Sequence, residues 1–316
     1  MRLLLLAGCC ALLAFAATNV LASAGVILHW RRTRPTWTRL SASSLLRLRC
    51  LAATISTATA GLIVLPSFLV HEPRASVEAI GLPLALGAAL GFVIFASGLV
   101  RGLLAWLRTR SAVRAYMRSA KRVTLPGWSG PAWVVDGSAG VCVVGLWRPA
   151  LLVSRGVLAS CTPRELSGIV AHERAHVAAL DNWKKLLVRC VPDVLAWTPV
   201  ARVLDCARDA RSEEEADVEA LRSDRTLGVE IAGALVKVAR SRSGAALPLA
   251  TPFGAEGPIS RRVRRLLNDA QPQPDRRSAW TGLWAAVLAP ALLCAAFPEL
   301  SRRVHDAVVA VVQLLT

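Results

Sequence analysis

The 316-residue chain has few charged and few aromatic residues. Charged residues make up 19% of it and aromatic residues 5%, whereas a soluble globular protein has about 25% charged residues. Hydrophobic residues account for 54%, which excludes intrinsic disorder, because disordered chains are too polar to bury a core. The shortage of charge and the mean hydropathy of +0.47 together indicate a membrane protein.

Paired cysteines are also missing. None of the eight cysteines belongs to a C-x-x-C pair, and at least Cys9, Cys10 and Cys294 lie in apolar runs. Disulfide-stapled domains and cysteine-ligated zinc sites depend on regularly spaced cysteines. The cysteine pattern therefore indicates neither kind of protein.

Four uncharged stretches are long enough to cross a bilayer, which takes about 20 residues. They predict transmembrane helices at residues 1–30, 50–70, 79–100 and 279–298. The first resembles a signal peptide with a cleavage site near residues 22–24, but its uncharged run from Leu3 to Trp30 favours a retained helix. In the third, Gly87-x-x-x-Gly91 allows close helix packing, although a lipid-facing coincidence explains it equally well.

The chain is strongly basic, with 38 Lys and Arg against 21 Asp and Glu and a net charge of +17. Such a balance is typical of nucleic-acid-binding proteins. However, two stretches without acids, residues 31–50 and 101–122, carry six and seven of the basic residues. Cytoplasmic loops beside membrane spans have this bias. We predict that residues 31–49 and 101–278 are cytoplasmic, and that the N-terminus, loop 71–78 and a short tail at 299–316 are external. The expected partner of this charge is the lipid bilayer, and nucleic-acid binding becomes a minor hypothesis.

The long cytoplasmic segment is large enough for one α+β domain. Apolar runs at 132–136 and 141–144, separated by Gly137-Ser138-Ala139-Gly140, predict a β-hairpin, and residues 150–154 predict a third strand. Thr162 as N-cap, Pro163 as the first helical residue and Glu165 form a capping box that begins a helix. The predicted fold class is therefore mostly α: a polytopic membrane protein with four transmembrane helices and a cytoplasmic α+β domain.

That helix carries the pattern His-Glu-Arg-Ala-His at residues 172–176. Side chains four residues apart lie on one helix face, so His172 and His176 can bind one Zn²⁺, and Glu173 can reach a water on it. The alternative is two ordinary surface histidines. The three other histidines fall at membrane edges or in the external tail, where a polar ring tip at the interface explains them better.

A hydrolytic zinc site needs a third protein ligand. The acidic stretch at residues 208–217 lies in a predicted helix from Pro199 to about Leu221, where Glu213 and Asp217 share a face. One carboxylate is expected to bind the metal and the other to orient a ligand. The alternative is a solvated acidic helix face.

Together these motifs resemble the BlaR/MecR antirepressors, integral-membrane zinc metallopeptidases of the gluzincin type, and more distantly the HtpX and CAAX-processing peptidases. The resemblance rests on Gly145 to Val153, on Glu165 to Asp181, on Glu213-Glu214-Glu215-Ala216-Asp217 and on Ser260 to Leu267. It implies a gluzincin-like zinc peptidase domain in which Zn²⁺ is bound by His172, His176 and Glu213. Glu173 would then be catalytic, and Asp217 and Asp181 would support the ligands.

The resemblance also implies how a substrate would bind. In such peptidases an edge strand pairs with the extended substrate, which assigns substrate binding to Ala150, Leu151, Leu152, Val153 and Ser154. A helper for the oxyanion is not identifiable, although Arg208 and Arg211 are candidates. Asn182 departs from the family, since many relatives have His there.

The expected function is hydrolysis of a cytosolic or membrane-proximal protein, and the resemblance suggests a winged-helix transcriptional repressor, with self-cleavage as a further possibility. Because no penicillin-binding domain follows the fourth span, the trigger is expected from a separate sensor protein or from the membrane part. Two alternatives stay open. One is a quality-control peptidase of the HtpX type, and the other is a non-catalytic membrane receptor or adaptor. Retention of Glu173 argues against the latter, because zinc binding alone needs no base.

Overall fold

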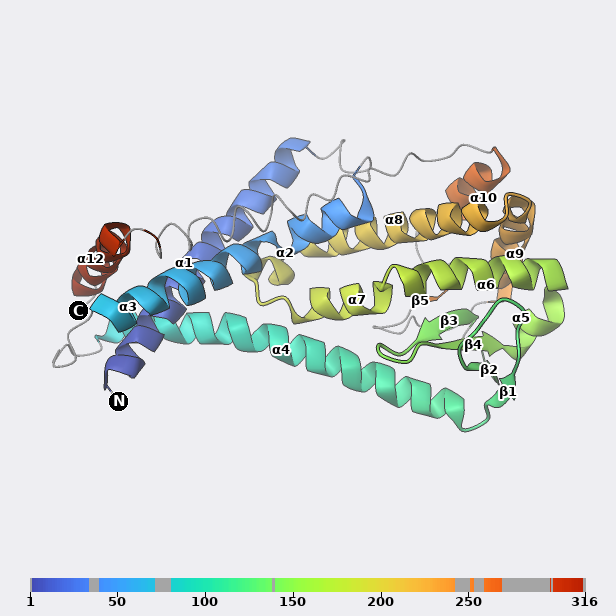
Figure 1. Ribbon diagram of the computed structural model, residues 1–316, viewed down its shortest axis with the longest axis horizontal. Helices are drawn as coiled ribbons and strands as arrows, with labels where there is room; N and C mark the ends of the chain where they lie inside the picture. Colours follow the sequence, from blue (N-terminus) through green and yellow to red (C-terminus); the bar gives the residue numbers. More distant parts are fainter. Residues whose placement is uncertain are drawn as a thin grey trace.

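The protein is mostly helical and contains one small sheet, as predicted (Figure 1). The computed structural model describes residues 2–33, 40–71, 81–137, 140–241, 251–252, 259–268, 296 and 298–314. The predicted fourth span at 279–298 lies almost entirely outside the described residues, so it stays a prediction. The same holds for the external loop at 71–78, of which only His71 is described.

Three long apolar helices come first in the chain. They are α1 (Arg2–Thr33), the continuous helix made of α2 (Ala42–Ala58), η2 (Thr59–Val64) and α3 (Leu65–His71), and α4 (Leu82–Met117). Each is long and apolar enough to cross a membrane. The first three predicted spans are thus found as helices, and their orientation across the membrane stays a prediction.

Two helix boundaries differ from the prediction. The second helix begins at Ala42 rather than at residue 50, because Ser41 caps it by accepting a hydrogen bond from the Ser44 backbone N–H. Much of the predicted loop at 31–49 is therefore helical. The third helix continues past residue 100 to Met117, because no proline interrupts the Leu, Ala and Arg residues that favour a helix there.

Helices α1 and α4 pack closely where Gly87 and Gly91 face α1. A Cβ atom on Gly91 would overlap the backbone carbonyl of Leu12, and one on Gly87 would overlap the side chain of Leu13. The close-packing interpretation of this glycine pair is confirmed, and the lipid-facing alternative is wrong. Small residues allow such an approach because they let two backbones come together.

The sheet contains β1 (Lys121–Val123), β2 (Ala132–Val135), β3 (Val141–Val144), β4 (Ala150–Ser154) and β5 (Thr251–Pro252) in the order β1-β2-β4-β3-β5. The predicted hairpin is wrong, because β4 lies between β2 and β3, parallel to the former and antiparallel to the latter. The run at Leu151–Val153 is apolar on both faces and fully buried, which suits a central strand.

Helices cover both faces of the sheet (Figure 1). On one face, α6 (Pro163–Ala178) and α9 (Leu227–Ser241) share the largest core with the sheet. On the other, the last turns of α4 pack Val113, Tyr116 and Met117 against the strands. The other helices of the described residues are α5 (Arg155–Ser160), α7 (Asp181–Cys190), η3 (Val194–Trp197), α8 (Pro199–Ser223), α10 (Ile259–Leu267) and α12 (Pro298–Leu314).

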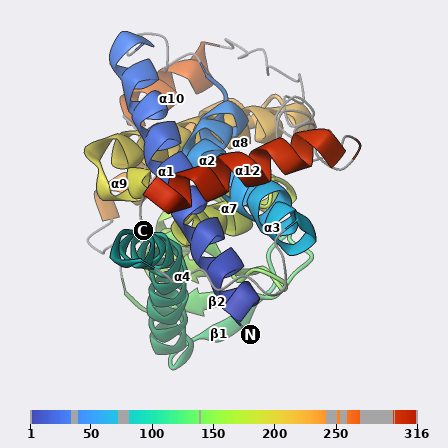
Figure 2. The ribbon, with the colours of Figure 1, turned by 90° about the vertical axis from the view of Figure 1, so that its left-hand side faces the viewer.

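Helix α12 occupies most of the predicted tail at 299–316. It crosses the end of the apolar part beside α3 (Figure 2), where Val308 and Val309 pack against a cluster that contains Phe68. The end of the chain is therefore an ordered helix that packs against the apolar helices, and its external location stays a prediction.

The capping box at the start of α6 is confirmed and yields a stability prediction. The Thr162 Oγ1 accepts from the Glu165 N–H at 3.2 Å, and the Glu165 carboxylate accepts from the Thr162 N–H at 2.7 Å. Thr162→Ala should lower the free energy of unfolding by about 1 kcal/mol, the usual cost of losing an N-cap side chain. Thermal unfolding in detergent measures this. Ser167→Ala is the control, since its exposed hydroxyl bonds only to the same helix; an equal loss in both variants would contradict the prediction.

Candidate metal centre

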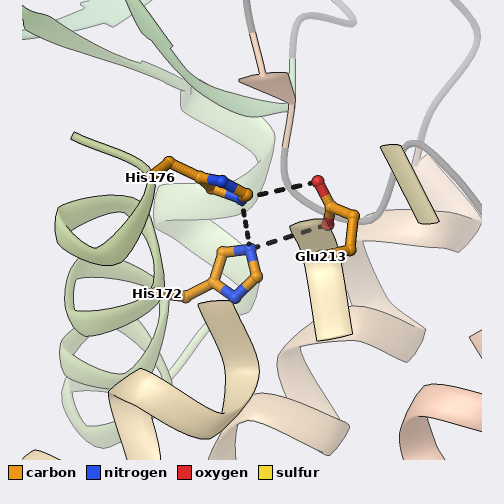
Figure 3. A group of neighbouring side chains, drawn as sticks. All are labelled: His172, His176 and Glu213. Atoms are coloured by element: carbon orange, nitrogen blue, oxygen red, sulfur yellow. Dashed lines mark hydrogen bonds and ion pairs between the residues drawn. The ribbon is translucent and has the colours of Figure 1, made fainter. Parts of the chain in front are cut away.

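Helix α6 brings the two histidines of the sequence motif together. His172 and His176 lie on the same face and are buried, and their Nε2 atoms are 3.0 Å apart (Figure 3). The alternative of two surface histidines is therefore wrong. Two neutral imidazole nitrogens this close together can both bind one cation.

Helix α8 supplies the third group. Glu213 is buried and turns its carboxylate toward both imidazoles, with Oε2 3.6 Å from the His172 Nε2 and Oε1 3.4 Å from the His176 Nε2 (Figure 3). One atom from each of the three residues lies within 4.8 Å of the others. The interpretation of the acidic run as a solvated face is wrong for Glu213, and the three residues can hold a metal ion.

Two further carboxylates orient the imidazoles from behind. The His176 Nδ1 donates to the Asp181 Oδ2 at 2.7 Å, and the His172 Nδ1 lies 2.9 Å from the Asp217 Oδ1. Asp181 also accepts from the Ser212 hydroxyl of α8 at 2.6 Å. A carboxylate on one ring nitrogen leaves the lone pair of the other nitrogen free for a metal. The geometry is what the predicted supporting roles of Asp181 and Asp217 require, and those roles stay predictions.

The sequence interpretation missed Arg262 of α10. This side chain is 2% exposed. Its Nε and Nη2 atoms donate to the two oxygens of Asp217 at 2.8 and 2.7 Å, and its Nη1 donates to the Glu213 Oε2 at 2.6 Å. From the sequence, residues 260–267 were interpreted only as a basic helix. A signal was present, because Arg262 shares a helix face with Leu266, whereas Arg261 and Arg264 are exposed.

Opposite charges determine the protonation of this cluster. Burial by itself would raise the pKa of Glu213, but Arg262 and the two histidines hold it well below its usual value. Burial would lower the pKa of His176, but its hydrogen bonds to Asp181 and Glu213 raise that pKa to about 10. The pKa of Asp181 is lowered in turn, since its interactions with His176 outweigh its burial. A metal ion that binds here replaces protons, because only neutral imidazole is a ligand.

Glu173 differs from these paired carboxylates. It is fully buried, and neither of its oxygens has a hydrogen-bond partner among the described residues. Burial raises the pKa of Glu173 to about 7. A buried polar group without a partner needs an explanation, such as a ligand or a water. A metal ion with a water next to the two histidines would supply that partner, so the residues present fit a metal.

The prediction that the strand at residues 150–154 binds the substrate through a free edge is wrong. Ala150, Leu151, Leu152, Val153 and Ser154 form β4, whose two edges are already hydrogen-bonded to β2 and β3. No edge of β4 is left for a substrate, because a strand has only two. The order of strands depends on contacts distant in sequence, so the strand could be predicted but not its place in the sheet.

The two candidate arginines for the oxyanion are engaged elsewhere. Arg208 forms an ion pair with Asp209, and Arg211 donates to the Glu214 carboxylate at 2.5 Å. Asn182, the departure from the family pattern, donates to the backbone carbonyls of Val143 and Gly145 at 3.2 and 3.1 Å. Asn182 thus anchors the end of β3 to the start of α7.

Comparisons with known proteins agree with this geometry. Residues 73–266 match the protein family described as BlaR1 peptidase M56. The matched region contains the whole candidate metal centre from α6 to Arg262 and the last of the three apolar helices. None of the curated proteins matches the chain.

The buried ion pairs of Arg262 lead to a second prediction. Arg262→Met should destabilise the metal-free protein by about 3–5 kcal/mol, because it leaves the Glu213 and Asp217 carboxylates buried without their cation. Thermal unfolding in detergent with a chelator present measures the loss. Arg264→Met on the exposed face of the same helix is the control and should change stability by less than about 0.5 kcal/mol. Equal stability of the two variants would show that Arg262 does not compensate these carboxylates.

Proposed function

The chain belongs to the BlaR1 peptidase M56 family, and on that basis we propose that it is a membrane-anchored zinc metallopeptidase. Its substrate in this proposal is a cytosolic or membrane-proximal protein. Membership supports a membrane-associated metallopeptidase, and the three apolar helices are consistent with that location. The finer assignments, which are zinc, the catalytic residues and the substrate, are ours.

One observation carries the proposal: the carboxylate of Glu173 is buried next to two convergent histidines and has no hydrogen-bond partner among the described residues. A protein that only binds a metal has no need of a buried base beside it. Leaving such a group without a hydrogen bond costs about 1–3 kcal/mol or more. This arrangement favours an enzyme over a receptor or adaptor.

The donor set suits zinc. Two imidazole nitrogens and one carboxylate are the ligands of catalytic zinc in several metallopeptidases, with one position left open. His172 and His176 would bind through Nε2 and Glu213 through its carboxylate. When bound, zinc would polarise the substrate carbonyl and lower the pKa of a water molecule to near 7.

Glu173 would act as the general base. Its pKa of about 7 suits a group that takes up and releases a proton near neutral pH. In peptide hydrolysis a carboxylate oxygen of Glu173 would accept the proton of the attacking water and then pass it to the leaving amine nitrogen. Asp181 and Asp217 would hold the imidazoles in the orientation that keeps Nε2 available.

The substrate proposal rests on two arguments. The apolar helix α4 runs directly into the layer that covers the sheet, so the site belongs to a domain tied closely to the membrane part. By resemblance to the antirepressors, the substrate would be a winged-helix repressor, cleaved in a regulatory pathway. A separate sensor protein would supply the signal.

Glu173→Gln tests the proposal. The amide keeps the shape but cannot accept the proton, so cleavage of a candidate repressor by the purified chain should fall by about 10²–10⁴-fold. Zinc content, measured by metal analysis, should stay at one ion per chain, whereas His176→Ala should lose it. Glu219→Gln, at an exposed residue of α8, is the matched control and should cleave normally.

Undiminished cleavage by Glu173→Gln would remove Glu173 from the mechanism. Cleavage of unfolded membrane proteins but not of a repressor would favour the quality-control alternative. Retention of zinc by the double variant His172→Ala and His176→Ala would show that the metal binds elsewhere.

A further inference from the structure

The turn after α7 lies among the three apolar helices. We call residues 190–194 the clamped turn. Side chains from two apolar helices bond to its backbone: the Asn19 amide of α1 donates to the Pro192 carbonyl and accepts from the Val194 N–H, both at 2.9 Å, and the Arg101 guanidinium of α4 donates to the Val191 carbonyl at 2.7 Å. A buried backbone must have its polar groups paired, so the position of this turn depends on how the helices pack.

Two glycines of α4 leave this turn no room to move toward the helix. A Cβ atom on Gly98 would come within 2.5 Å of the Cys190 carbonyl and 2.9 Å of the Pro192 Cα. One on Gly102 would overlap the Cys190 sulfur. At Gly98 the contact is between two backbones, so it transmits displacement directly, because neither partner has a flexible side chain there to absorb it.

The second apolar helix binds the clamped turn through a buried ion pair. Arg49 of α2 is 2% exposed and forms ion pairs with Asp193, in the clamped turn, and with Asp205 of α8, the latter at 3.2 Å. Breaking a buried pair is strongly destabilising, because it leaves a charge uncompensated. One guanidinium therefore joins α2 both to the turn and to the helix that carries Glu213.

From the turn, α7 leads directly to the metal centre. Its ten residues span about 15 Å as a single rigid helix. At its far end Asp181 binds the Nδ1 of His176 and the Ser212 hydroxyl of α8. Helix α2 has a second contact with α8, since the Ala42 N–H donates to the Glu215 carboxylate at 2.9 Å.

From these contacts we infer that the apolar helices position the metal centre. Asn19, Arg49 and Arg101 are positioning residues: they fix the clamped turn, and through α7 they determine where Asp181 holds His176. A shift of α4 against α1 moves the turn and changes how His176 presents its Nε2. The inference rests on the proposed function for its consequence, namely that these three residues set the geometry in which the peptidase holds its metal.

Gly98→Ala tests this positioning in the full-length chain purified in detergent. Zinc affinity is measured by competition with a chromophoric chelator, a readout that needs no substrate. The added methyl group pushes the clamped turn, so affinity should fall by about tenfold, at the lower end of what disturbing an outer partner of a ligand costs. Gly25→Ala is the matched control, because a Cβ there meets nothing within 4 Å.

A double-mutant cycle separates positioning from general damage. Asp181→Ala removes the group of α7 that accepts from the His176 Nδ1, so adding Gly98→Ala to it should lower zinc affinity by less than about twofold further. Gly98→Ala with wild-type affinity, or losses that simply multiply in the double variant, would overturn the inference. If Gly98→Ala does not fold, Gly102→Ala decides by the same criteria, since its methyl group meets mainly the Cys190 side chain.

The outcomes also separate this inference from the proposed function. A wild-type chain that binds zinc but cleaves no protein would remove the peptidase proposal, and the zinc affinities of the variants would still decide the positioning. A wild-type chain that binds no zinc would overturn both.

Discussion

Burial of the Glu213 carboxylate is the constraint on which the rest of the centre depends. A charge taken out of water is stable only with several well-placed partners, and Glu213 has three of them on two helices: the two histidines of α6 and Arg262 of α10. Those partners bring their own counter-charges, Asp181 and Asp217. The result is a set of alternating charges in which every described member but Glu173 is paired. Glu173 is the group that would act as general base in the proposed hydrolysis.

Buried polar side chains of the apolar helices are also paired with groups of the domain that holds the centre. Arg49 and Asn19 lie on helices apolar enough to span a membrane, yet both are buried against the domain that holds the centre. Polar side chains in such helices are costly unless they have partners inside the protein. Here the partners are the clamped turn and α8, so the two parts of the protein form one packed structure.

Local patterns were predictable from the sequence, and contacts between distant segments were not. The capping box, the spacing of His172 and His176, and the shared face of Glu213 and Asp217 are all properties of single helices. The place of β4 in the sheet depends on pairing across the chain, and the hairpin and the substrate edge were accordingly predicted wrongly. Arg262 was missed because its partners Glu213 and Asp217 are distant in the sequence, and its spacing from Leu266 was the one local sign that it turns inward.

The central claim is that a zinc ion binds to His172, His176 and Glu213. X-ray absorption at the zinc edge of the purified chain tests it most directly, because it reports the donor atoms around the metal. The account predicts two imidazole nitrogens and only nitrogen or oxygen donors, at about 2.0–2.2 Å. A sulfur donor at about 2.3 Å, from any of the cysteines, would contradict it.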